Sequence, residues 1–179
     1  MAVDIMSCYT TKPPVREYVL PGLIAGVAGS IVSPGGQGKS MLSLMLAHCI
    51  AGGVDLLGLG PLKSGPVAYL SAEDGGDVLH ERLHVIGARM SAEQRHACAD
   101  GLLIVDLTQH TPDLLNGTGA PEWRDFVERA ATGRRLLLLD TLRSVHSGDE
   151  NDGTDWGLDD GVPKCGVQNA GETWFVYVR

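Results

Sequence analysis

Residues 26–51 read GVAGSIVSPGGQGKSMLSLMLAHCIA, and this stretch decides the fold. Small and apolar residues over 26–32 predict a buried strand, and apolar residues at helical spacing over 39–51 predict a helix that Gly52 and Gly53 close. A glycine-rich loop joins the two. Strand, glycine-rich loop and helix in this order predict a phosphate-binding site, because the backbone N–H groups and the positive end of the helix meet the anion.

The loop offers three kinds of group that a bound nucleotide needs. Its glycines let backbone amides converge on the phosphates, Lys39 reaches the terminal phosphates, and the Ser40 hydroxyl ligates magnesium. The usual pattern opens with Gly, whereas this sequence has Ser33 there. We predict phosphate contacts from Ser33, Pro34, Gly35, Gly36, Gln37, Gly38, Lys39, Ser40 and Met41.

Two other strands end in carboxylates. Asp140 follows the apolar run 136–139, which places it at the sheet edge where open α/β folds bind ligands, and we expect it to hold Mg2+ through water. Glu73, with Asp74 beside it, follows the predicted strand 66–71 and could orient and deprotonate an attacking water. The alternative is that Glu73 and Asp74 form a capping cluster before the next helix.

The rest of the chain alternates strands with helices. This pattern predicts an α/β fold with a mostly parallel sheet between two helical layers. We expect a lead-in over residues 1–20 and one domain over 21–179. Further predicted strands are 66–71, 102–107, 136–139 and 173–178; predicted helices are 77–89, one capped by Ser91 with Gln94 in the capping box, and 121–131; predicted loops are 108–120 and 144–161.

Composition limits the class of protein. The chain is 44% apolar and 20% charged, so it can form a core, and its net charge of −8 argues against a freestanding basic nucleic-acid binder. Four scattered cysteines suggest reduced thiols in a cytoplasmic protein. No leader sequence and no apolar run of about 18 residues is evident, so no membrane span is expected.

A competing motif lies at residues 80–84, where HERLH matches the zinc-protease pattern H-E-x-x-H. Both histidines share one helix face, and Glu81 would be the general base. The extended pattern requires a third histidine where this sequence has Met90, so only His96 or Asp106 could serve as a third ligand. A zinc hydrolase therefore stays open as a remote alternative, against histidines on a helix surface.

Five segments carry a family resemblance: YVLPGLIAGVAGSIVSPGGQGKSMLSLMLA, GPVAYLSAED, HERLH, ADGLLIVDL and GRRLLLLDTLR. Together they resemble the RepA-type hexameric replicative DNA helicases of broad-host-range plasmids, which belong to the RecA-like P-loop superfamily. The resemblance covers residues 14–151 with the motifs in family order, and the serine that opens the loop also fits.

The resemblance implies a RecA-like core that uses ATP and Mg2+ to drive 5′-to-3′ unwinding of DNA, with single-stranded DNA as partner and a hexameric ring as assembly. It implies that Lys39 and Ser40 bind phosphate and magnesium. It also implies that Glu73 is the catalytic base and that Asp140 is the carboxylate on the magnesium side. It also implies that Arg82 packs against adenine, the alternative being a solvent-facing helix residue.

The sequence departs from the family after residue 151. Residues 152–172 match poorly, and Arg179 stands where the family has a histidine pair. In the family, this region is followed by a trans-acting arginine finger and DNA-contacting loops. We therefore expect a domain that is incomplete at its C-terminus, a truncated copy, with a nucleotide-binding module that lacks motor activity (remnant or regulator) as the alternative function.

Overall fold

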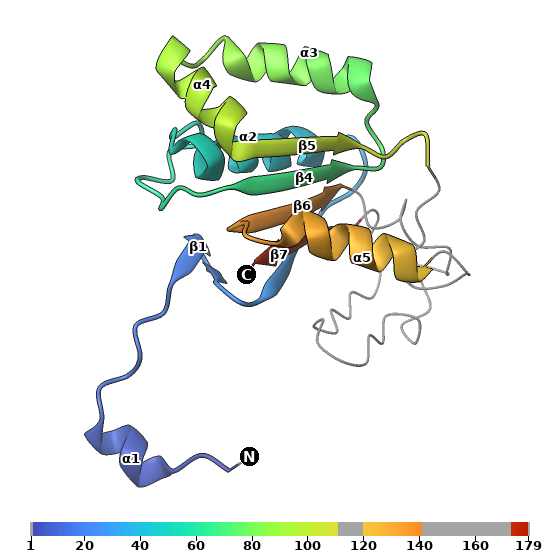
Figure 1. Cartoon of the computed structure of the whole chain (residues 1–179). Coiled ribbons are helices and arrows are strands. Elements are labelled where there is room, and N and C mark those ends of the chain that lie inside the picture. Colours follow the sequence, from blue (N-terminus) through green and yellow to red (C-terminus); the bar gives the residue numbers. More distant parts are fainter. Residues whose placement is uncertain (1, 111–119, 141–172, 179) are drawn as a thin grey trace.

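The computed structural model describes residues 2–110, 120–140 and 173–178. The loop predicted at 144–161, and most of the loop predicted at 108–120, lie outside the described residues. The elements, shown in Figure 1, are α1 (Ile5–Thr10), β1 (Tyr18–Leu20), β2 (Leu23–Ile24), β3 (Ala28–Val32), α2 (Lys39–Gly52), β4 (Val67–Ser71), α3 (Gly76–Gly87), α4 (Ala92–Gly101), β5 (Leu102–Asp106), α5 (Ala120–Ala131), β6 (Leu136–Asp140) and β7 (Thr173–Val178).

The main sheet has five strands in the order β3-β7-β6-β4-β5. β4 runs parallel to both β5 and β6, whereas β7 is antiparallel to its neighbours β3 and β6. Four of the five strands therefore point the same way, and their carboxyl ends meet at one edge. The predicted mostly parallel α/β sheet is confirmed, and the strand predicted at 173–178 runs against the others.

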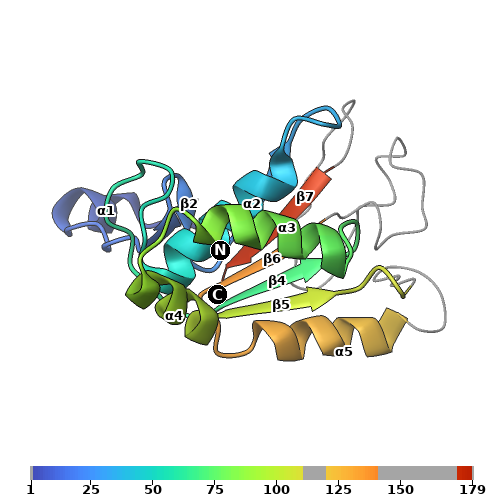
Figure 2. The ribbon, with the colours of Figure 1, turned by 90° about the horizontal axis from the view of Figure 1, so that it is seen from above.

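Helices cover both faces of this sheet, as predicted (Figure 1). On one face Tyr69, Leu136 and Leu138 pack in a cluster with residues of α2, α3 and α4. On the other face Leu70 and Leu139 pack with residues of α5. Figure 2, seen from the first face, shows α3 in front of the strands. β4 and β6 are buried along their whole length, and their sequences are nearly continuous apolar runs; β3, which was predicted to be buried, and β5 are only partly buried.

Local chain signals set the ends of the helices. α2 is closed by its C-cap Gly53, whose φ of 63° is the left-handed conformation that glycine adopts without strain. α4 begins at Ser91 with the predicted capping box: the Ser91 hydroxyl accepts from the Gln94 amide, and the Gln94 side chain accepts from the Ser91 amide. These two predictions are confirmed.

The first twenty residues are more ordered than predicted. In place of an irregular lead-in, they contain α1 and β1, and β1 pairs antiparallel with β2, which follows directly after them. α1 forms because the Asp4 carboxylate accepts from the Ser7 amide at 3.1 Å, which caps the helix. None of its residues is buried, and it lies away from the sheet (Figure 1).

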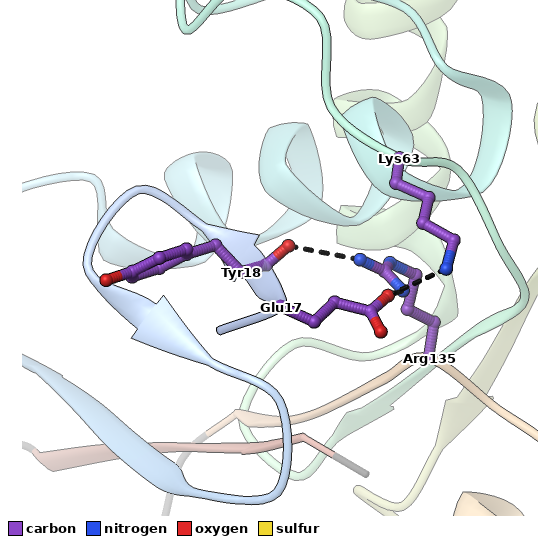
Figure 3. Close-up of polar contacts among 4 residues, drawn as sticks. All are labelled: Glu17, Tyr18, Lys63 and Arg135. Atoms are coloured by element: carbon purple, nitrogen blue, oxygen red, sulfur yellow. Dashed lines mark hydrogen bonds and ion pairs between the residues drawn. The ribbon is translucent and has the colours of Figure 1, made fainter. Parts of the chain in front are cut away.

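A charged cluster ties β1 to the body of the domain. The Glu17 carboxylate accepts from Lys63 at 2.8 Å and from Arg135 at 2.6 Å (Figure 3). Arg135 also donates to the Tyr18 carbonyl at 3.1 Å. The cluster lies at the edge where β6 begins, opposite the edge where the parallel strands end.

The helices of residues 2–110 and 120–140 are too short or too polar to cross a bilayer.

Candidate nucleotide site

The loop between β3 and α2 has the conformation of an anion cradle. Gly36 and Gly38 have φ values of 74° and 78°, and a Cβ at either position would meet no atom within 4 Å. Glycine is thus required there for its backbone conformation rather than for space. Gly38 is the N-cap of α2, no side chain caps that end, and the first turn has no acidic residue. The amides and the positive end of α2 are therefore left for an anion.

Lys39 lies across this loop. Its side chain is buried, and Nζ donates to the Ser33 carbonyl at 2.9 Å and to the Pro34 carbonyl at 3.0 Å. The ammonium is thus held over the start of the loop that the sequence predicts for phosphate. A terminal phosphate can replace these carbonyls as the acceptor, because a charged oxygen makes the stronger bond.

The other residues that we predict to contact phosphate differ in how buried they are. Ser40 is buried in the first turn of α2, and Met41 packs partly against the core. The residues from Pro34 to Gly38 are exposed. Of the predicted contact residues 33–41, those of the loop are thus accessible, whereas those in the first turn of α2 are buried or partly buried.

Asp140 is fully buried at the carboxyl end of β6. Its Oδ2 accepts a hydrogen bond from the Tyr69 hydroxyl, while Oδ1 is buried and has no hydrogen-bond partner among the described residues. Burial raises the pKa of Asp140 to about 7; the Tyr69 bond lowers it, and the negative charges of Asp74 and Glu73 raise it further.

These groups fit Mg2+. A buried carboxylate oxygen without a partner costs free energy, and a divalent cation or its bound water is the kind of group that satisfies it. The Asp140 carboxylate and the Ser40 hydroxyl are oxygen ligands, which Mg2+ prefers. Because β3 and β6 point the same way, both residues lie at the same edge of the sheet.

Glu73 lies in a turn that its neighbours fix. After β4, the Ser71 hydroxyl donates to the Asp74 carbonyl at 2.8 Å and accepts from the Asp74 amide at 3.2 Å. Asp74 is buried, whereas Glu73 is exposed. β4 pairs with β6 so that Ser71 lies opposite Asp140, which brings this turn next to the Asp140 carboxylate.

The structure shows one side chain at the start of α3, and it belongs to neither Glu73 nor Asp74; the alternative role of these two residues as helix caps stays a prediction. The first residues of α3 are reached by a side chain from another strand: Asp106 of β5 accepts from the Gly76 amide at 2.8 Å. The Asp106 carboxylate thus meets the first amide of α3, while the Asp74 carboxylate pairs with Arg82.

Arg82 pairs with Asp74 rather than facing solvent. Its Nη2 donates to Asp74 Oδ1 at 3.1 Å, and the second nitrogen pairs with the other carboxylate oxygen. Three quarters of the arginine side chain is buried, since 25% of it is exposed. The solvent-facing alternative does not match the structure, and a contact of Arg82 with adenine stays a prediction.

The described residues give the zinc interpretation no third ligand. His80 and His84 are exposed on α3 as the motif requires, but nowhere in residues 2–110, 120–140 and 173–178 do three His, Cys, Asp or Glu gather as a metal site. Asp106 already accepts from Gly76 and Thr108, and Met90 is buried in the core.

Sequence reasoning missed two contacts of the site, Tyr69 with Asp140 and Asp74 with Arg82. Both join residues that only the packed fold brings together. The signal for the first was a tyrosine inside an apolar strand, since a buried hydroxyl needs a polar partner.

One comparison with known proteins bears on the whole site. A family model described as an AAA domain matches residues 2–165. The match includes the loop at 33–41, the turn with Glu73, Arg82 on α3 and Asp140 at the end of β6.

Proposed function

The chain belongs to the AAA domain family, and we propose that it binds Mg2+ and ATP and hydrolyses ATP as the motor core of a RepA-like replicative DNA helicase. Membership makes the chain a nucleotide-binding domain of the ATPase type. The observation that carries the finer proposal is the meeting of three groups at one sheet edge: the glycine-capped start of α2 with Lys39, the turn with Glu73, and Asp140.

Each group has a distinct task in this proposal. The amides at the start of α2 and the Lys39 ammonium bind the phosphates, and Lys39 exchanges its two loop carbonyls for a phosphate oxygen. Ser40 and Asp140 hold Mg2+, directly or through its water. When bound, Mg2+ neutralises charge that develops on the phosphate oxygens.

Glu73 acts on the water. Glu73 is an exposed residue beside the partly buried Asp74–Arg82 pair, so it can reach a water molecule while its turn stays fixed. It orients that water toward the terminal phosphate and accepts its proton. Arg82 would contact adenine in the same proposal, after giving up part of its contact with Asp74.

The helicase part of the proposal rests on the resemblance of the motifs. It includes single-stranded DNA as the partner, a hexameric ring as the working assembly and the cytoplasm as the location. The net charge of −8 means that DNA must meet local basic groups or an assembled ring rather than a generally basic surface. A nucleotide-binding module without turnover is the competing outcome.

Steady-state ATP hydrolysis with and without single-stranded DNA tests the proposal. We expect turnover that DNA increases, and we expect Lys39→Ala to lower nucleotide affinity or turnover about a hundredfold, since a charged contact to phosphate is lost. Lys63→Ala, at the opposite edge of the sheet, is the matched control and should leave turnover unchanged. Binding without turnover would favour the module, and no nucleotide binding at all would reject the proposal.

A further inference from the structure

Tyr69 is a polar residue in the middle of an apolar core. It lies on the central strand β4, has no exposed surface, and packs in the cluster that joins the sheet to α2, α3 and α4. A tyrosine hydroxyl in such surroundings costs free energy unless it finds a partner. The partner here is Oδ2 of Asp140.

The strand register explains why the phenol reaches this carboxylate. Tyr69 lies opposite Leu138 on β6, and Asp140 is two residues further along the same strand, so it projects to the same face. The ring therefore extends along this face toward the strand end. Leu at position 69 would fill the same core but would leave both carboxylate oxygens without a donor.

The bond makes the two oxygens of Asp140 unequal. Oδ2 receives the phenol proton, while Oδ1 is buried without a hydrogen-bond partner among the described residues. An oxygen that already accepts a proton donor is the weaker metal ligand, so the cation is directed to Oδ1.

We propose that Tyr69 is a positioning residue for magnesium: its hydroxyl fixes the rotation of the Asp140 carboxylate and reserves Oδ1 for the ion or its water. This inference rests on the proposed function. A group that orients a metal ligand through a hydrogen bond typically changes metal affinity about 10- to 100-fold when it is removed.

Tyr69→Phe tests this, because it removes one oxygen and keeps the ring that fills the core. The measurement is the Mg2+ concentration that gives half-maximal enhancement of binding of a fluorescent ATP analogue. We expect this midpoint to rise about tenfold in Tyr69→Phe, with nucleotide affinity in EDTA unchanged. Tyr18→Phe, at an exposed tyrosine, is the matched control.

The outcomes separate the inference from the proposed function. An unchanged Mg2+ midpoint in Tyr69→Phe, with binding intact, overturns the positioning role alone. A wild-type chain that binds the analogue at no Mg2+ concentration overturns the proposed function. In an Asp140→Asn background, Tyr69→Phe should no longer move the midpoint, since the carboxylate that it orients is gone.

A second readout needs no substitution, so it holds even if Tyr69→Phe does not fold. The chain has four tyrosines, and carbon-13 at their Cζ atoms reports on hydrogen bonds of the hydroxyl by NMR. We expect one buried tyrosine resonance to shift when Mg2+ is added to the nucleotide-bound protein, because the bond to Oδ2 weakens. If none of the four resonances moves, the inference is wrong.

Discussion

At the edge where β6 begins, Glu17 lies between two cations, whereas at the edge where β6 ends, Asp140 is buried near other carboxylates. Glu17 accepts from Lys63 and Arg135 (Figure 3), and these bonds lower its pKa to about 2. Burial raises the pKa of Asp140 to about 7. The same type of side chain is thus perturbed in opposite directions at the two edges of one sheet.

The difference separates a contact within the fold from the edge where we propose that a ligand binds. At the first edge the negative charge finds its partners within the chain. At the second edge the partners are incomplete: Oδ1 of Asp140 has none among the described residues. Groups that a protein leaves costly in this way are typical of functional sites, where a ligand completes them.

The largest expected effect tests whether the carboxyl edge performs chemistry. Glu73→Gln should lower ATP turnover about 10²- to 10⁴-fold, because the amide cannot accept a proton from water. Nucleotide affinity should stay close to that of the wild type, measured by equilibrium binding of a fluorescent ATP analogue. Glu128→Gln, at an exposed position on α5, is the control. Loss of binding in Glu73→Gln would show that Glu73 has another role.

A smaller effect tests whether the buried Asp140 carboxylate lowers the stability of the nucleotide-free protein. Asp140→Asn should raise the free energy of unfolding of the nucleotide-free protein by about 1–3 kcal/mol at pH 8, since it removes a buried charge that lacks a cation. Urea denaturation measures this, with the exposed Asp125→Asn as control. Destabilisation of the nucleotide-free protein by Asp140→Asn would mean that the Tyr69 hydrogen bond and the rest of the chain already compensate the buried charge, and the contrast between the edges would disappear.

The smallest effect concerns the other edge and depends on pH. Because the pKa of Glu17 is lowered from 4.5 to about 2 in the folded state, its contribution to stability is present above pH 4.5 and is lost as the pH falls through about 2. Glu17→Gln should therefore lower the melting temperature slightly at pH 7, and this difference should vanish near pH 2. Salt should also reduce it, because the cluster is exposed. If the difference in melting temperature persists at pH 2, it arises from packing of the Glu17 side chain and not from its charge.

The conformation of the loop was predictable because it is encoded locally. A contiguous run fixes the turn, the helix start and the place of Lys39, so residues 33–41 lie where the motif puts them. The positions of Glu73 and Asp140 followed from a simple rule, since strands of a parallel sheet end at one edge. The α/β class followed from the alternation of apolar strands with helices.

Other features were not predicted, and some of them depend on pairing across long sequence separations. The bond from Tyr69 to Asp140 joins residues 71 positions apart and requires the register of β4 against β6. The pairing of Arg82 with Asp74 requires the angle at which α3 leaves the turn. The sequence of β7 likewise does not predict its direction, because an apolar strand fits a sheet in either direction. The short helix α1 was missed although Asp4 is an ordinary capping residue.

The position of β7 in the sheet determines when β3 gains its neighbour during synthesis. β3, the strand that leads into the phosphate loop, has β7 as its neighbour in the sheet, with Ala28 opposite Tyr177 and Val32 opposite Thr173. A ribosome synthesises β3 early and β7 late, so the edge of β3 stays without this neighbour until residues 173–178 emerge. Amide hydrogen exchange on chains stalled before and after this segment would show it, as slower exchange in β3 only after β7 has been released.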